Sequence, residues 1–149
     1  MREFIAERPW IIALLAGTLV QTMKFLTHWA RHKRPNFRVL TSTGGMPSSH
    51  SAGVCALTTA IYATEGGRSA LFSVALYFSL IVMYDATGLR RSAGLQAAIL
   101  NRIVDEQFIH HRKAGEGRLK ELLGHTPLEV LVGALLGILF ALTWYPSGG

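Results

Sequence analysis

A run of small, hydroxyl-bearing and imidazole residues from Gly44 to His50 (GGMPSSH) stands directly before an apolar segment. A helix that starts near Pro47 would point the unpaired amides of its first turn at an anion. The hydroxyls of Ser48 and Ser49 and the imidazole of His50 would add further donors around that anion. An ordinary helix start explains the same run, because Pro at the first helical position and Ser at the cap are common. The run alone leaves both interpretations open.

A second cluster of reactive residue types, LGHTPLE at positions 123–129, again precedes an apolar run. His125 and Glu129 are four positions apart, so a helical register would put both side chains on one face. Glu129 could then bind one ring nitrogen of His125 and leave the other nitrogen to act as a nucleophile. The pair therefore predicts an activated histidine.

Four more charged residues are candidates for holding a phosphate group. Asp85 closes an apolar segment, and an acid at membrane depth needs a cationic partner. Arg90 or Arg91 could be that partner while the other arginine grips a phosphate in a planar, two-pronged contact. Lys24 is the remaining phosphate-binding candidate. The structural alternatives are an interfacial salt bridge for Asp85 and a snorkelling side chain for Lys24.

The fold class follows from where the apolar residues lie. Half of the 149 residues are apolar, and long uncharged blocks predict an all-α, polytopic membrane bundle in one domain, 1–149. A soluble bundle is disfavoured because the segment 130–140 shows no polar stripe. The block 51–63 carries Ser, Thr and Gly and is expected inside the bundle. The four predicted transmembrane blocks are Trp10–Met23, Ser51–Ala63, Ala70–Tyr84 and Leu128–Trp144.

One further segment, 92–108, has the mixed pattern of an amphipathic helix and is predicted to lie along the membrane surface. The formal net charge is +6, but no aromatic-basic recognition motif accompanies it, so anionic lipid is the expected partner and nucleic acid is not. Cys55 is the single cysteine, which excludes an intrachain disulfide and a cysteine zinc cluster.

Four crossings would bring the candidate groups together at one side of the membrane. Lys24 lies near the end of the first helix, His50 at the start of the second, Asp85 at the end of the third and His125 at the start of the fourth. The connectors on that side are rich in Lys and Arg, so the positive-inside rule places the site in the cytoplasm. The chain is thus expected to be a multi-pass integral membrane protein with a cytoplasmic active site.

These residue types favour phosphoryl transfer through a histidine. His125 would attack phosphorus, cations and amides would hold the developing charge, and His50 would protonate the leaving oxygen. Glu129 would fix the tautomer of His125. This chemistry calls for no metal and no cofactor.

The chain resembles the divergent branch of the type 2 phosphatidic acid phosphatase superfamily, which is related to acid phosphatases and vanadium-dependent haloperoxidases. Pro47-Ser48-Ser49-His50 is similar to the superfamily signature Pro-Ser-Gly-His, whose histidine is the acid, and this implies that role for His50. The third signature is Ser-Arg, five residues, His, three residues, Asp. His125 matches its nucleophile and Glu129 stands in place of Asp.

Two signatures are altered in this sequence. Arg118 and Leu119 occupy the positions of the Ser-Arg pair, and Arg34-Pro35 lacks a lysine seven positions earlier. We expect Arg90 and Arg91 to replace the missing arginine and Lys24 to serve as the lysine. The remaining similarity lies in VMYDA at 82–86 and the glycine and arginines that follow it.

The sequence therefore predicts an integral membrane phosphatase that hydrolyses a lipid phosphate or isoprenoid diphosphate through a phosphohistidine. Two alternatives remain: a metal-dependent membrane hydrolase, and a non-catalytic protein that binds or transports phospholipid headgroups. The oligomeric state is open, although Gly133 and Gly137 form a small-xxx-small pattern that favours packing within the chain over packing against a second copy.

Overall fold

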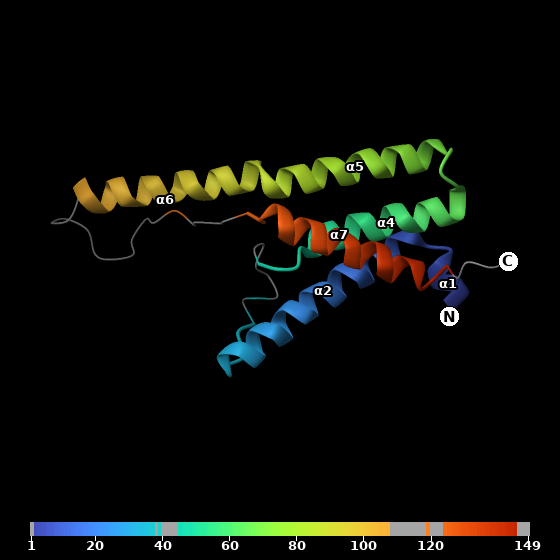
Figure 1. The fold of residues 1–149 in the computed structure, drawn as a ribbon, viewed down its shortest axis with the longest axis horizontal. Helices are drawn as coiled ribbons and strands as arrows, with labels where there is room; N and C mark the ends of the chain where they lie inside the picture. Colours follow the sequence, from blue (N-terminus) through green and yellow to red (C-terminus); the bar gives the residue numbers. More distant parts are fainter. Residues whose placement is uncertain (1, 38, 40–44, 108–118, 120–123, 146–149) are drawn as a thin grey trace.

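The computed structural model describes residues 2–37, 39, 45–107, 119 and 124–145, without the side chains of residues 2, 89–91 and 107. These ranges form helices and connecting loops and contain no strand. Figure 1 shows the arrangement of the helices. They are α1 (Arg2–Ala6), α2 (Pro9–His32), α4 (Ser49–Glu65), α5 (Ala70–Thr87), α6 (Leu89–Gln107) and α7 (Pro127–Leu142).

Side-chain caps define where three of these helices begin. The Ser69 hydroxyl accepts from the Phe72 amide at 3.1 Å at the start of α5. Thr126 caps α7 in a reciprocal capping box with Glu129. Ser48 caps α4, so that helix begins at Ser49 and the expected start near Pro47 was wrong by two residues. The hydroxyl of Ser48 satisfies an amide of the first turn, and this fixes the boundary.

Helix α4 is the centre of the bundle and packs against α2, α5 and α7. Its closest approach is to α7, where a Cβ on Gly133 would collide with the backbone of Ser48 and a Cβ on Gly137 with the backbone of Ala52. Only glycine allows two helix backbones to approach so closely. The small-xxx-small pattern therefore packs within the chain, as the sequence favoured.

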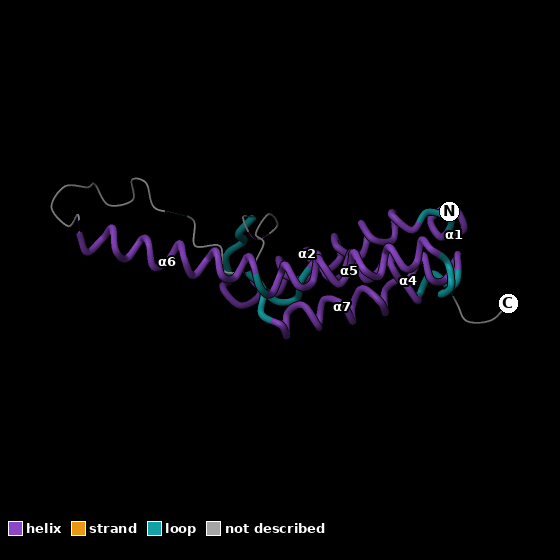
Figure 2. The backbone as a smooth tube through the Cα atoms, turned by 90° about the horizontal axis from the view of Figure 1, so that it is seen from above, coloured by secondary structure: helices purple, strands orange, loops and turns teal. Residues whose placement is uncertain are grey.

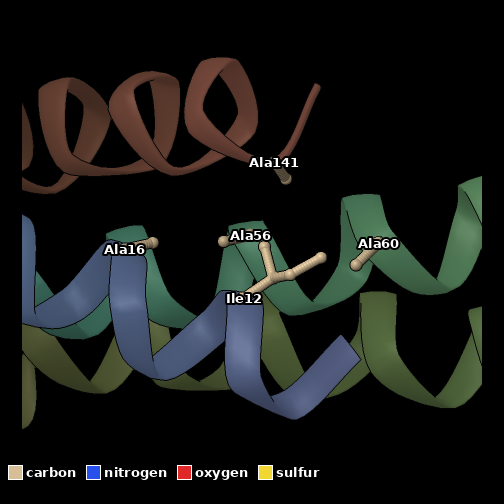
Figure 3. Close-up of a cluster of buried hydrophobic side chains, with 5 residues drawn as sticks. All are labelled: Ile12, Ala16, Ala56, Ala60 and Ala141. Atoms are coloured by element: carbon tan, nitrogen blue, oxygen red, sulfur yellow. The ribbon is translucent and has the colours of Figure 1, made fainter. Parts of the chain in front are cut away.

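At the end of the bundle away from His50, small side chains fill the core. This closed end consists of Ile12, Ala16, Ala56, Ala60 and Ala141, which lie together between α2, α4 and α7 (Figure 3). The Tyr145 hydroxyl donates to the Ala6 carbonyl at 2.6 Å and ties the end of α7 to α1. Burial raises the pKa of Tyr145, so this hydroxyl stays protonated as a donor.

The largest apolar side chains face outward, the reverse of a water-soluble core. Tyr77 and Val74 on α5 are more than 60% exposed, and Leu139 on α7 is 61% exposed. Such a continuous apolar exterior around an alanine and glycine interior suits lipid. The stretches Pro9–His32 and Ala70–Glu106 are long and apolar enough to cross a membrane, and Pro127–Leu142 is apolar but shorter. Four crossings stay a prediction, since α4 has only 17 residues.

Helix α6 differs from the expectation of a helix turned onto the membrane surface. It begins at Leu89 and continues the line of α5 past the bundle (Figures 1 and 2). The reason is local. Gly88 keeps right-handed helical angles, and its amide donates to the Tyr84 carbonyl at 2.9 Å while its carbonyl accepts from Ser92 at 3.0 Å. The backbone therefore passes through Gly88 without the left-handed residue that commonly ends a helix.

Candidate active site

The helices alternate in direction, so four candidate groups far apart in sequence reach one end of the bundle (Figure 1). Lys24 lies eight residues before the end of α2, His50 in the first turn of α4, Asp85 in the last turn of α5 and His125 two residues before the start of α7. We call this the active-site end. Of these groups, His50, Asp85 and His125 line one cavity, whereas Lys24 lines another.

His125 is held by bonds to its backbone and to its ring. Its amide donates to the Ala86 carbonyl of α5 at 3.0 Å, and its side chain is 3% exposed. Ring atom Nδ1 lies 3.1 Å from Oε2 of Glu129. A carboxylate at that place favours the tautomer with its hydrogen on Nδ1, which leaves the lone pair on Nε2. The residue pair thus has the geometry of an oriented nucleophile.

Glu129 is fixed in turn by the start of α7. The same Oε2 accepts from the Thr126 amide at 3.0 Å, and the Thr126 hydroxyl accepts from the Glu129 amide at 3.3 Å. The capping box that starts the helix therefore also positions the carboxylate behind His125.

The two histidines border one cavity of about 180 Å³ between α4, α5 and the start of α7. His50 is exposed, whereas Asp85 is partly buried at the cavity wall. Ile81 lines the same cavity and is 48% exposed on the outer face of α5. The cavity therefore joins two imidazoles and a carboxylate to an apolar surface of the protein.

The two serines of the first motif lie differently from each other. The hydroxyl of Ser48 is fully buried and accepts from the amide and hydroxyl of Ser51, at 3.3 and 3.0 Å. Its amide donates to the Glu129 carbonyl at 3.0 Å. Ser48 thus caps α4 and joins it to α7. Ser49, the first residue of α4, is partly buried, and neither serine lines the cavity with the histidines.

Lys24 is 5% exposed, and its ammonium has no hydrogen-bond partner among the described residues. The Glu129 carboxylate attracts it electrostatically. Lys24 borders a second cavity of about 390 Å³ rather than the cavity with the histidines. The structure therefore places this lysine at a different cavity from the two imidazoles.

The predicted arginines cannot be placed as ligands. Arg90 and Arg91 belong to the first turn of α6, close in sequence to Asp85, but their side chains lie outside the described residues. Within the described ranges, no three His, Cys, Asp or Glu side chains gather to hold a metal ion. The phosphate-binding role of the arginines stays a prediction.

Sequence reasoning missed His28, Arg31 and His32, which line the second cavity with Lys24. The signal was present, since positions 24, 28, 31 and 32 follow the i, i+4, i+7, i+8 spacing of one helical face. It was overlooked because the sequence from His28 onward was interpreted as a basic connector, whereas α2 continues to His32.

A family model described as the divergent PAP2 family matches residues 5–140. The chain is 40% identical over 150 residues to the "Uncharacterized membrane protein YuiD" of Bacillus subtilis (strain 168), covering 94% of this chain and 95% of that relative. No solved structure matches the chain.

Proposed function

The chain belongs to the divergent PAP2 family, and from that premise we propose that it is an integral membrane phosphatase for lipid phosphates or isoprenoid diphosphates. The family model confirms the resemblance that the sequence motifs indicated. The relative's description and the apolar helices support a membrane location. The observation that carries the proposal is the pair of histidines at one cavity, with Glu129 bound to the far side of His125.

The first step is attack on phosphorus by Nε2 of His125. The new N–P bond forms as the P–O bond to the lipid breaks, and a protonated His50 gives its proton to the leaving oxygen. Glu129 stabilises the positive charge that develops on the His125 ring. The products of this step are the dephosphorylated lipid and phosphorylated His125.

Water completes the cycle in the second step. Neutral His50 takes a proton from the attacking water, the P–O bond to that water forms, and the N–P bond to His125 breaks. Inorganic phosphate leaves, and both histidines return to their starting protonation states. The cycle needs no metal ion.

The charge on the phosphate would be held by Lys24, Arg90, Arg91, Ser49 and amides of the first turn of α4. Asp85 is negative and does not attract a phosphate directly. We assign it to orienting a cation beside the phosphate, either protonated His50 or one of the two arginines. Ser48 supports this site through the cap of α4.

A lipid substrate fits the position of the cavity. Ile81 borders both the cavity and the outer face of α5, so an acyl or prenyl chain could lie on the apolar exterior while its phosphate meets the histidines. The Lys- and Arg-rich connectors at this end support the proposal that it faces the cytoplasm, by the positive-inside rule.

The test is phosphate release by the purified protein in detergent with a chelator present, over a panel of lipid phosphates and diphosphates. Wild type is compared with His125→Ala and with Thr126→Ala, a neighbouring change that removes a cap hydroxyl and keeps the histidine. We expect turnover by wild type and Thr126→Ala and none by His125→Ala.

Other outcomes would select another function. Turnover that requires a divalent ion would favour the metal-dependent hydrolase. Lipid binding without turnover under either condition would favour the headgroup-binding or transport protein.

A further inference from the structure

Two buried hydroxyls join α4 to α5 at some distance from the cavity with the histidines. The hydroxyl oxygens of Thr58 on α4 and Ser79 on α5 lie 2.7 Å apart, and both residues are more than nine-tenths buried. The Thr58 hydroxyl also lies 3.1 Å from the Ala75 carbonyl of α5. The Ser79 hydroxyl lies 3.1 Å from the Val54 carbonyl of α4. Each hydroxyl thus reaches the backbone of the opposite helix, and we call this pair the hydroxyl clamp.

The helix faces that form the hydroxyl clamp lead directly to the active-site end. About one turn closer to that end, the sulfur atoms of Cys55 on α4 and Met83 on α5 lie 3.8 Å apart. Beyond this contact, His50 on α4 and Asp85 on α5 line the cavity. The register of α4 against α5 at the clamp therefore carries over to the two walls of the cavity.

The other two sides of the cavity are fastened by backbone hydrogen bonds. The Ser48 amide donates to the Glu129 carbonyl at 3.0 Å and joins α4 to α7. The His125 amide donates to the Ala86 carbonyl at 3.0 Å and joins the start of α7 to α5. The hydroxyl clamp supplies the third side, between α5 and α4. Together the three contacts form a closed frame around the reactive groups.

We propose that Thr58 and Ser79 are positioning residues of the active site. The clamp holds α5 in one register against α4 and so places Asp85 and His125 relative to His50. This inference rests on the proposed phosphatase function, in which both imidazoles act on one phosphate. A displacement of about 1 Å can cost about a hundredfold in rate. A hydroxyl bond between apolar helices resists such a displacement, because a separated hydroxyl finds no water there.

Matched variants separate the clamp from other hydroxyls of the same helices. Thr58→Val keeps the branched side chain and removes the hydroxyl, whereas Thr58→Ser keeps the hydroxyl. Thr59→Val is the control, since the Thr59 hydroxyl donates to the Cys55 carbonyl of its own helix at 2.8 Å. On α5, Ser79→Ala breaks the clamp. Its control is Ser73→Ala, at an exposed position where the hydroxyl donates within the same helical segment.

The first measurement is phosphate release in detergent. We expect Thr58→Val and Ser79→Ala each to lower kcat by about tenfold to a hundredfold, with KM within about twofold of wild type, because the reacting groups are misplaced while the lipid-facing surface is kept. The double variant should be no worse than either single one, since the two hydroxyls act as a unit. Thr58→Ser and the controls should keep kcat near wild type. An equal fall in Thr58→Val and Thr59→Val, or a raised KM with unchanged kcat, would overturn the proposal.

The second measurement, amide hydrogen exchange by mass spectrometry, requires no activity. We expect Thr58→Val to speed exchange by about threefold to tenfold in the peptides that contain His125 and the end of α5, as for loss of one hydrogen bond between membrane helices. Exchange at the closed end should not change. An equal rise in all helices would mean that the clamp contributes only general stability, and this would overturn the proposal. If wild type releases no phosphate, the proposed function fails, and exchange alone still decides whether the clamp places His125.

Discussion

The two ends of the helix bundle are built from different kinds of contact. At the closed end, Ile12 packs among alanines from α2, α4 and α7, and no charged side chain belongs to that described cluster. At the active-site end, the same helices carry Lys24, His50 and His125, with capping hydroxyls at the starts of α4 and α7. Packing therefore dominates one end, and hydrogen bonds and charges dominate the other.

Helix α4 connects these two ends and shows why both are needed. Its contacts with Gly133 and Gly137 fix the spacing between α4 and α7. That spacing sets how far His50 on α4 lies from His125 before α7. Close packing between α4 and α7 therefore positions the reactive groups at the active-site end of the bundle.

The largest expected effect is from Gly137→Leu, which would disturb the packing of α4 against α7 and so both ends of the bundle. The added side chain would meet the backbone of Ala52, which cannot move without displacing α4. We expect the free energy of unfolding to fall by more than about 3 kcal/mol, the upper part of the range for overpacking, because the backbone rather than a side chain must shift. Thermal unfolding and gel filtration in detergent measure it. Leu139→Ala, on the exposed face of α7, is the control, and equal stability of the two variants would contradict the packing account.

Glu129→Gln tests the active-site end alone. The side-chain oxygen of the new glutamine can still accept a hydrogen bond from the Thr126 backbone amide. The neutral glutamine no longer stabilises a positively charged His125 ring. We expect kcat to fall by roughly 10²–10⁴-fold, as for loss of an acid–base partner, with KM little changed. Thr126→Ala should instead cost about 1 kcal/mol of stability through the lost cap and leave kcat near wild type. If both variants lower kcat alike, Glu129 acts only as a cap.

Ile12→Ala tests the closed end alone, and we expect a smaller effect than from Gly137→Leu. Ile12 is fully buried, so its truncation leaves a cavity. We expect the free energy of unfolding to fall by about 2 kcal/mol, the low end of the range for such truncations in water-soluble proteins. The value is low because the apolar side chains of a separated membrane helix stay in lipid and are not exposed to water. Unfolding in detergent gives the loss, and kcat at low temperature should be unchanged. A large fall in kcat would show that the two ends are coupled more tightly than the contacts suggest.

Much of the fold could be predicted from apolar blocks and caps. The blocks at 70–84 and 128–144 located α5 and α7 within a few residues, because long uncharged apolar runs usually form membrane-spanning helices. The start of α4 was placed two residues early, because both Pro47 and Ser48 are common at helix starts and only the hydrogen bonds show which residue is the cap. The path of α6 depends on the angles of Gly88, which the sequence does not specify.

Some parts of the candidate site could be predicted from the sequence and others could not. Spacing sufficed for His125 and Glu129, since four residues on a helix define a contact. The meeting of His50 with His125 followed from alternating helix directions. The second cavity could not be predicted, because it needs the loop at Gly45 to fold back over Lys24, and loop paths depend on tertiary contacts.

The central claim is that His125 carries the phosphoryl group, and trapping that intermediate tests it most directly. The protein would be mixed with a lipid substrate labelled with radioactive phosphate, quenched in alkali, which preserves phosphohistidine, and digested for peptide mapping. The account predicts label on the peptide that contains His125 in wild type and no labelled peptide in His125→Ala. Turnover by wild type with no labelled enzyme, or with label on another residue, would contradict it.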